Sequence, residues 1–166
     1  CENMPGCSAY KPGDILTAKN GKTIEVDNTD AEGRLTLADA LCYACELGVD
    51  EVIDLATLTG ACVVALGTNA AGIMGNDETL VKNLISTADR SGERYWELPL
   101  WDEYFDSLKS DIADMKNTGS RWGGASTAGV FLQKFVKDVK WAHIDIAGVA
   151  YLEKPQQEFI KGATGA

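Results

Sequence analysis

The chain has 166 residues, of which 45% are hydrophobic, and its formal net charge is −10. A chain of this size can bury one substantial core, so a single domain is the simplest expectation. The acidic balance argues against a nucleic-acid-binding surface, which would need clustered lysines and arginines, and no apolar run approaches the length that spans a bilayer.

The cysteine and histidine content limits the redox and metal chemistry that we expect. An odd count of five cysteines with a single histidine favours neither a thiolate zinc site nor a disulfide framework. A reducing cytoplasm is therefore the expected compartment.

The first third of the chain predicts a hairpin, a helix and a strand. Asn20-Gly21 supplies the tight turn between strands at 15–18 and 23–26. Apolar residues cover most of the helix expected over 34–47, so we expect it to be largely buried. Residues 51–56 read as a short apolar strand, and the three elements together predict a βαβ-like unit.

The rest of the chain continues the alternation of helices and strands. Asn76 or Asp77 is the expected cap of a helix that Gly92 ends. Further expected elements are a short aromatic helix after Pro99, a polar glycine-rich loop over a site at 116–124, a helix from about Ser126, and an inner strand at 141–146. This order predicts an α/β fold, with a layered sheet flanked by helices.

One stretch, residues 28–35 (NTDAEGRL), concentrates chemistry at the junction of a strand and a helix. In an extended segment Asp30 and Glu32 would point the same way, and converging carboxylates need a proton, a cation or an arginine between them. Gly33 would let the backbone turn, and Arg34 would place a positive fork beside the pair. The pattern indicates a hard-cation site with an anion-binding arginine; the alternative is an ordinary loop before a capped helix.

Other polar residues have a structural and a functional interpretation. Thr57, Leu58, Thr59 and Gly60 leave the strand 51–56 at the edge where we place the carboxylates, either as an ordinary turn or as part of the site. His143 is expected to be structural. For Asp54 and Asp145, structural hydrogen bonding is the main expectation and support of the site the minor one.

Two acidic residues farther along the chain could imitate a metal cluster. Asp111 and Asp114, close to Lys116, have helical spacing. We expect them to form a solvated face instead.

The motif also carries a family resemblance. Residues 28–41 (NTDAEGRLTLADAL) resemble the signature of the cytosol (leucyl) aminopeptidases, a two-metal family that removes N-terminal residues from peptides. Further segments that resemble the family, in the same order, are 2–5, 11–14, 56–61 and 141–148. The resemblance implies a phosphorylase/hydrolase-like zinc-peptidase architecture, truncated so that residues 1–166 form the C-terminal part of the catalytic domain.

The resemblance assigns roles to the matching residues. Asp30 and Glu32 would be ligands of two divalent ions, Mn²⁺ or Zn²⁺ with Mg²⁺ as a further candidate, and Glu32 would bridge them. Arg34 would hold a bicarbonate that acts as general base. The substrate would lie along Thr57, Leu58, Thr59 and Gly60. Two cations can activate a water, polarise the scissile carbonyl and anchor the free amine of a peptide.

The resemblance also implies what the chain lacks. The family's other metal ligands and its catalytic lysine lie upstream of the stretch that resembles residues 1–5. We therefore expect the parent protein to be a leucyl-type aminopeptidase, homohexameric like its family, and this fragment alone to be inactive or nearly so. The rival interpretations are a non-catalytic scaffold or binding module that kept the fold, a DNA-binding family member, and a Mg²⁺-dependent phosphoryl-transfer enzyme, which would need a phosphate-cradling glycine loop.

Overall fold

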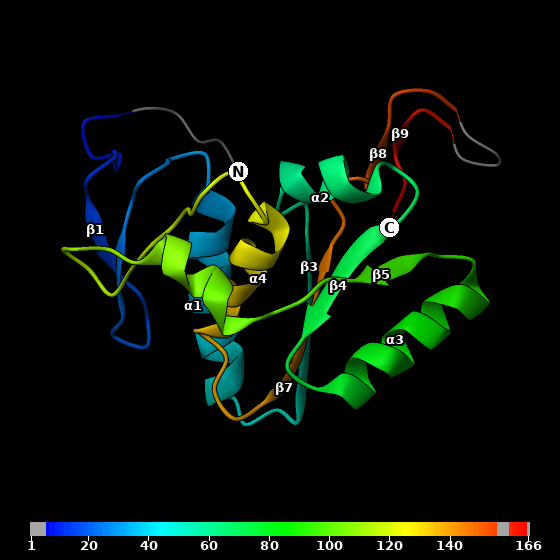
Figure 1. The fold of residues 1–166 in the computed structure, drawn as a ribbon, viewed down its shortest axis with the longest axis horizontal. Helices are drawn as coiled ribbons and strands as arrows, with labels where there is room; N and C mark the ends of the chain where they lie inside the picture. Colours follow the sequence, from blue (N-terminus) through cyan, green and yellow to red (C-terminus); the bar gives the residue numbers. More distant parts are fainter. Residues whose placement is uncertain (1–5, 156–159, 166) are drawn as a thin grey trace.

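A computed structural model describes residues 6–155 and 160–165 of the chain (Figure 1). Its elements in chain order are β1 (Ile15–Thr17), β2 (Thr23–Glu25), α1 (Glu32–Glu46), β3 (Glu51–Ala56), α2 (Gly60–Leu66), β4 (Ala71–Gly75), α3 (Glu78–Ser91), β5 (Tyr95–Glu97), the 3₁₀ helix η1 (Asp102–Leu108), β6 (Met115–Lys116), α4 (Gly124–Gln133), β7 (Lys140–Asp145), β8 (Tyr151–Leu152) and β9 (Gly162–Ala163). The segment 2–5, one of those that carry the family resemblance, lies outside the described residues.

The larger sheet has the order β3-β7-β4-β5 and mixed strand directions. β3 runs parallel to β7, while β4 runs antiparallel to β7 and parallel to β5. A second sheet, β1-β2-β6, stands beside it, and β8 pairs with β9. In Figure 1, α1 and α4 lie on one side of the larger sheet and α3 on the other. The predicted α/β architecture, a mixed sheet flanked by helices, is confirmed.

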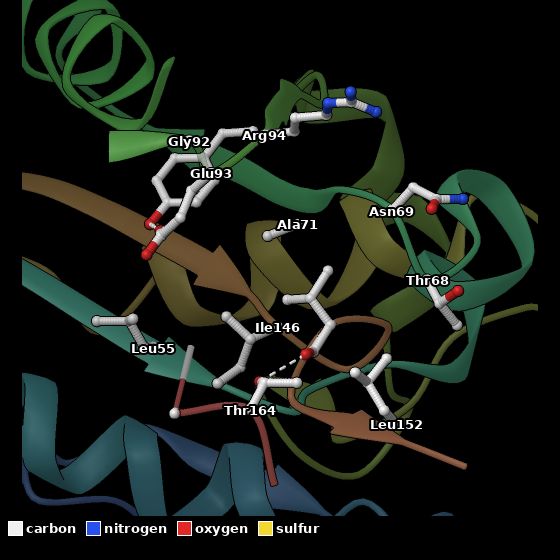
Figure 2. Close-up of a pocket in the computed structure, with 13 residues that line it drawn as sticks. Leu55, Thr68, Asn69, Ala71, Gly92, Glu93, Arg94, Ile146, Leu152 and Thr164 are labelled. Carbon is white, nitrogen blue, oxygen red and sulfur yellow. Dashed lines mark hydrogen bonds between the residues drawn. The ribbon is translucent and has the colours of Figure 1, made fainter. Parts of the chain in front are cut away.

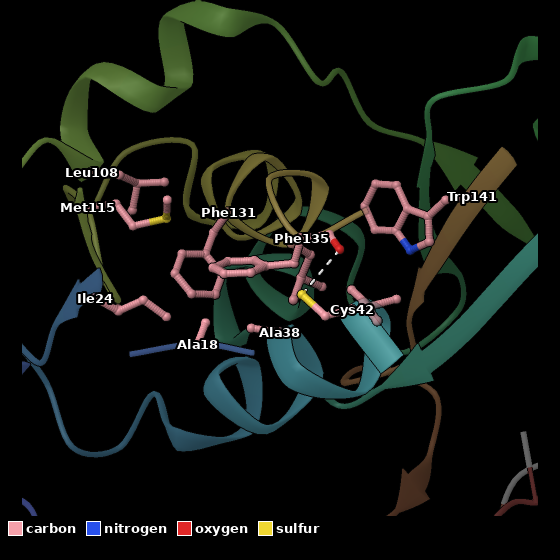
Figure 3. Close-up of a cluster of buried hydrophobic side chains, with 11 residues drawn as sticks. Ala18, Ile24, Ala38, Cys42, Leu108, Met115, Phe131, Phe135 and Trp141 are labelled. Atoms are coloured by element: carbon pink, nitrogen blue, oxygen red, sulfur yellow. Dashed lines mark hydrogen bonds between the residues drawn. The ribbon is translucent and has the colours of Figure 1, made fainter. Parts of the chain in front are cut away.

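Each face of the larger sheet has its own apolar core. The cluster between α1, α4 and the sheet reaches across to the smaller sheet (Figure 3), and its buried members are Ala18, Ile24, Ala38, Leu41, Cys42, Leu108, Met115, Phe131, Leu132, Phe135 and Trp141. The cluster under α3 consists of Ala71, Ile73, Leu80, Val81, Ala142 and Ile144. Because β7 contributes alternate residues to both clusters, its side chains are buried from Trp141 to Asp145.

Local signals in the sequence explain several element boundaries. Gly21 has φ +85° in the turn between β1 and β2, a conformation that favours glycine. Asp77 caps α3 by accepting a hydrogen bond of 2.7 Å from Leu80 N. Gly92 ends α3 in the left-handed conformation. The predicted hairpin and the predicted ends of α3 are therefore confirmed.

The predicted βαβ-like unit is wrong. β2 and β3 belong to different sheets, because β2 pairs with β1 on one side and with the distant β6 on the other. α1 therefore connects the two sheets.

The prediction that α1 is largely buried is also wrong. Its buried residues are Ala38, Leu41 and Cys42, and Tyr43 is 56% exposed. α1 packs through one side only, so apolar residues elsewhere on its surface stay accessible. Within the described parts of the chain, no helix is both long and apolar enough to cross a membrane.

Candidate metal and substrate site

A small pocket brings the predicted site residues together at the C-terminal end of β3. Its volume is about 200 Å³, and it is lined by Asp30, Ala31, Glu32, Gly33, Arg34, Leu37, Ala56, Thr57 and Leu58. We call it the acidic pocket. The two carboxylates and the arginine come from one segment, while the opposite wall comes from the turn after β3. The structure thus brings these two motifs side by side, as the sequence indicated.

The backbone that carries the carboxylates differs from the expected extended segment. Asp30 lies in a turn and Glu32 is the first residue of α1. Asp30 N donates to Asn28 Oδ1 at 2.9 Å, the local bond by which Asx side chains close a turn. The strand-like argument for their convergence is therefore wrong, although both residues line the same pocket.

Gly33 also has a different role from the one predicted. It lies in the first turn of α1 and is not among the glycines with positive φ in the described chain. A Cβ atom added at Gly33 would meet nothing within 4 Å. The sharp turn comes instead from the residues just before α1.

Arg34 is held rigidly at the edge of the acidic pocket. Its Nη1 donates a hydrogen bond of 2.8 Å to the carbonyl oxygen of Asn117. Burial lowers the pKa of the Arg34 guanidinium, and the negative charge of Asp145 acts in the opposite direction. An arginine keeps its charge under such conditions, so the lining of the acidic pocket combines one cationic residue with the acidic residues Asp30 and Glu32.

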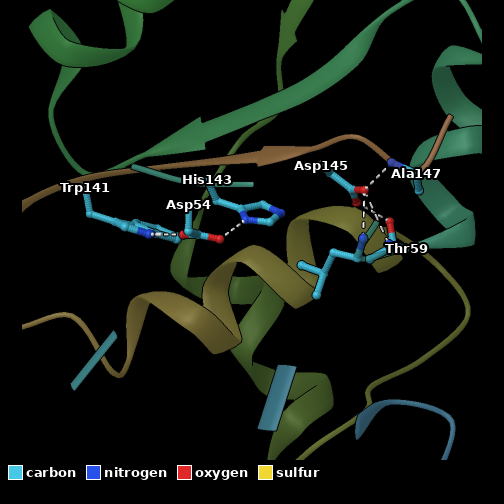
Figure 4. Close-up of polar contacts among 7 residues, drawn as sticks. Asp54, Thr59, Trp141, His143, Asp145 and Ala147 are labelled. Atoms are coloured by element: carbon cyan, nitrogen blue, oxygen red, sulfur yellow. Dashed lines mark hydrogen bonds and ion pairs between the residues drawn. The ribbon is translucent and has the colours of Figure 1, made fainter. Parts of the chain in front are cut away.

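Asp145 binds the turn after β3, which contributes Thr57 and Leu58 to the acidic pocket; Figure 4 shows its contacts with Thr59 and Ala147. This fully buried residue at the end of β7 accepts hydrogen bonds from Leu58 N at 3.2 Å, Thr59 N at 3.4 Å and Thr59 Oγ1 at 2.7 Å. Ala147 N donates to it as well, at 3.2 Å. The buried carboxylate is thus stabilised by four donors, three of them from the turn that we call the β3–α2 turn (residues 57–59).

The four residues predicted to border the substrate have different positions. Thr57 and Leu58 line the acidic pocket. Thr59 is buried behind it and caps α2, where its side chain accepts from Cys62 N at 3.0 Å. Gly60 begins α2. Their contacts with substrate remain a prediction.

His143 belongs to a buried network away from the acidic pocket. Its Nδ1 lies 2.6 Å from Asp54 Oδ1, and the other oxygen of Asp54 accepts from Trp141 Nε1 at 2.7 Å. His143 is fully buried in the sheet that Figure 4 shows. The arrangement agrees with the structural roles expected for His143 and Asp54.

Asp114 is exposed, like Asp111, as the sequence predicted, but it does not lie on a helix. Its Oδ2 accepts from Thr23 N at 2.7 Å and from Thr23 Oγ1 at 2.9 Å, just before β6. It therefore ties β6 to the start of β2, and residues 111–114 are not helical.

The donor chemistry of the acidic pocket fits a hard cation in part. Carboxylate oxygens suit Mg²⁺, Mn²⁺ and Zn²⁺. Over residues 6–155 and 160–165, however, no group of three or more His, Cys, Asp or Glu side chains is placed to hold a metal ion. Asp30 and Glu32 can therefore supply part of a coordination shell but not the whole of one.

A second, larger pocket contains none of the predicted site residues (Figure 2). It has a volume of about 410 Å³ and lies on the α3 side of the larger sheet, between Leu55, Ala71, Ile146 and the β8–β9 segment. Thr164 Oγ1 donates to Val149 O at 2.7 Å in its wall. Titratable lining groups come from the edge residues Glu93, Arg94 and Tyr95, so it lacks the paired carboxylates of the acidic pocket.

Comparison with known proteins identifies the family. The sequence profile described as the cytosol aminopeptidase family, catalytic domain, matches residues 1–166. The chain belongs to the cytosol aminopeptidase family.

Individual members of the cytosol aminopeptidase family match nearly the whole chain. A probable cytosol aminopeptidase of Cyanothece sp. is 57% identical over 164 residues, which are 99% of this chain and 33% of the relative. The chloroplastic leucine aminopeptidase 2 of Arabidopsis thaliana is 57% identical over 166 residues, covering 99% of this chain and 28% of the relative. The chain thus spans about a third of the length of the curated relatives it matches.

A solved structure of the family has the same fold. A mutant tomato leucine aminopeptidase superimposes with a TM-score of 0.94 at 52% identity, over 99% of this chain and 32% of that protein. The layered α/β architecture is therefore that of a leucine aminopeptidase segment.

Sequence reasoning missed one residue of the site. Asn117 follows β6 within the polar loop that we expected to cover a site, but nothing in its local sequence marks it. Only the three-dimensional structure shows that it contacts both Arg34 and the loop of Asp30.

Proposed function

We propose that the intact protein is a metal-dependent aminopeptidase that releases N-terminal residues from peptides, with a preference for leucine-like residues. The observation that carries the proposal is the acidic pocket, whose lining combines Asp30, Glu32 and Arg34 with residues 57 and 58 of the β3–α2 turn. Membership of the cytosol aminopeptidase family supports the reaction class, and the relative from Arabidopsis is named a leucine aminopeptidase.

We assign Asp30 and Glu32 to two divalent ions, Mn²⁺ or Zn²⁺ with Mg²⁺ as a further candidate, and Glu32 to the bridging position. Such ions supply an activated water, a polarised carbonyl and an anchor for the free amine. Because no group of three or more His, Cys, Asp or Glu side chains among the described residues could hold a metal, we assign the other ligands to the region that the relatives have and this chain does not cover.

The residues of this chain bind and orient the reactants. One N–H of Arg34 is donated to Asn117 O, which restrains the guanidinium at that end. Its other N–H groups can bind a planar oxyanion in two-point fashion, and bicarbonate is the anion we assign to it. Thr57 and Leu58 form the opposite wall, where their backbone would lie along the peptide.

The length of the chain bears on activity and assembly. Since it spans about a third of its relatives, we assign it to the C-terminal part of the catalytic domain and infer that it is inactive or nearly so by itself. We further propose that the intact protein is a homohexamer of the cytoplasm. The alternative is a non-catalytic scaffold or binding module, which the absence of a third neighbouring ligand among the described residues would favour.

A chimera tests the proposal. This chain would replace the matching 28% of the Arabidopsis relative, and hydrolysis of leucyl-p-nitroanilide would be followed with and without Mn²⁺. We expect metal-dependent turnover by the chimera, little or none by the chain alone, and loss of turnover in Asp30→Asn and Glu32→Gln. The exposed Asp111→Asn is the matched control. A chimera that turns over equally well with both carboxylates replaced would contradict the proposal.

A further inference from the structure

Asn117 is a fully buried amide whose polar atoms all have partners in one short loop. Its Oδ1 accepts from Asp27 N at 2.8 Å and from Asn28 N at 3.2 Å. Its Nδ2 donates to Asn28 O at 2.7 Å and to Ala31 O at 3.4 Å. The side chain has 0% exposure. These hydrogen bonds replace those with water and so offset the free-energy cost of burying the amide.

The loop that Asn117 binds carries the proposed metal ligands. We call residues 27–32 the acidic loop. The side chains of Asp27, Asn28 and Asp30 in it are exposed, and its internal hydrogen bonds include Asp30 N to Asn28 Oδ1 and Ala31 N to Asn28 O. These local bonds close a turn but do not connect it to the core. The amide of Asn117 makes that connection from a position about ninety residues later in the chain.

Asn117 also connects the acidic loop to Arg34. Its backbone carbonyl accepts the 2.8 Å hydrogen bond from Arg34 Nη1. Asn117 thus contacts the acidic loop through its side chain and the guanidinium through its main chain, while Tyr10 Oη adds a bond of 3.1 Å to Thr29 O of the same loop. The acidic loop and Arg34 therefore share one contact residue.

The segment around Asn117 is itself firmly supported. Asn117 N donates to Glu25 O at 2.9 Å, which extends the β2–β6 pairing. Thr118 Oγ1 donates to Asp27 Oδ2 at 3.0 Å. A Cβ atom at Gly119 would collide with Ser107 Oγ and approach Thr127 Cγ2 to 2.8 Å, so a larger residue there would force these side chains or the loop to shift.

We propose that Asn117 is a positioning residue of the metal site: its side-chain amide holds the acidic loop in the shape that lets Asp30 and Glu32 bind a divalent cation together. This inference rests on the proposed function, since it concerns the carboxylates assigned to metal there. Residues that orient metal ligands change metal affinity by about 10–100-fold when they are replaced.

The experiment measures Mn²⁺ binding to the ¹⁵N-labelled 166-residue chain by paramagnetic broadening of amide signals from residues 28–34. Asn117→Asp has the same shape but turns an oxygen towards the carbonyls of Asn28 and Ala31. Its added negative charge should by itself attract a cation, so weaker binding reports a change of geometry. Asn117→Ala removes all four contacts without adding charge and serves as the second variant.

The matched control is Asn76→Asp. Asn76 also makes structural bonds through its amide, accepting from Trp141 N at 2.7 Å and donating to Val139 O at 2.9 Å. It lies outside the acidic pocket. Amide signals of α3 and β7 report whether each variant is folded.

We expect both Asn117 variants to need at least about ten times more Mn²⁺ for equal broadening, with Asn76→Asp unchanged. The double variant Asp30→Asn/Glu32→Gln separates the two levels of the proposal. If the double variant is broadened like the wild type, the metal assignment is wrong and the role of Asn117 falls with it. If the double variant loses the broadening while folded Asn117 variants keep wild-type affinity, the positioning inference alone is wrong.

Discussion

Asp145 Oδ2 accepts a hydrogen bond of 2.7 Å from Thr59 Oγ1, and this contact joins the end of the buried strand β7 to the turn that follows β3. The other carboxylate oxygen accepts from the backbone amides of Leu58 and Thr59. The β3–α2 turn is therefore held from beneath by one side chain. We expect the position of this turn to depend on the hydrogen bonds that the Asp145 carboxylate accepts.

Asp145→Asn should destabilise the fold and loosen the β3–α2 turn. An asparagine has one oxygen, so its amide nitrogen must face either the Thr59 hydroxyl or the backbone amides of Leu58 and Thr59. Because a nitrogen of this kind donates and does not accept, at least one of these donors loses its partner. We expect the free energy of unfolding in urea to fall by about 1–3 kcal/mol and the amides of Leu58 and Thr59 to exchange faster with deuterium. Asp111→Asn, at an exposed position, is the control. Unchanged exchange at both amides would contradict the anchoring role.

His143→Asn should reduce stability without changing the acidic pocket. The smaller side chain cannot keep the 2.6 Å contact with Asp54, and a partly buried carboxylate oxygen loses its partner. We expect a loss of about 1–3 kcal/mol in urea unfolding together with wild-type Mn²⁺ broadening of residues 28–34. The opposite result, full stability with lost Mn²⁺ binding, would show that His143 is functional and not structural.

Two glycines near the site should respond in opposite ways to alanine. Gly33 lies inside α1 with open space around a new Cβ, so Gly33→Ala should stabilise the chain by about 0.5 kcal/mol. Gly119→Ala would collide with Ser107 and should destabilise it by about 1–3 kcal/mol. Thermal unfolding of the pair checks both signs. A stable Gly119→Ala protein would mean that the loop after β6 can shift without loss.

Cys62 should be almost unreactive at pH 8. Burial raises the pKa of its thiol from 9.0 to about 11, and thiolate, not thiol, is the nucleophile. Since the raised pKa keeps the proton on sulfur, alkylation should speed up only as the pH rises towards 11. Peptide mass spectrometry after iodoacetamide should show Cys7, which is exposed, modified long before Cys62. Equal rates at pH 8 in the folded chain would contradict this environment.

The parts of the fold that the sequence predicted are those set by local chemistry. Asn20-Gly21 specifies its turn, and Asp77 and Gly92 specify the ends of α3, because each acts on residues a few positions away. The pairing of β2 with β6 could not be predicted in this way, since β6 lies about ninety residues later in the chain. The role of Asn117 could not be predicted for the same reason, because its four side-chain hydrogen bonds all join residues about ninety positions apart in the sequence.

The candidate site shows the same division. The sequence identified Asp30, Glu32 and Arg34 by residue type and order, and the structure places them in one pocket with Thr57 and Leu58. The geometry inferred for them was wrong, because an Asx turn and a helix start at Glu32 replace the expected extended segment. Residue types indicate which chemistry is available, whereas the backbone path depends on contacts such as those of Asn117.

The most direct test of the central claim is the number and affinity of Mn²⁺ ions bound by the chimera with the Arabidopsis relative, measured by electron paramagnetic resonance of the free ion. If Asp30 and Glu32 are ligands, the chimera should bind two Mn²⁺ ions, and Asp30→Asn or Glu32→Gln should weaken binding by at least about tenfold. Unaltered stoichiometry and affinity in both variants would show that these carboxylates do not hold the metals.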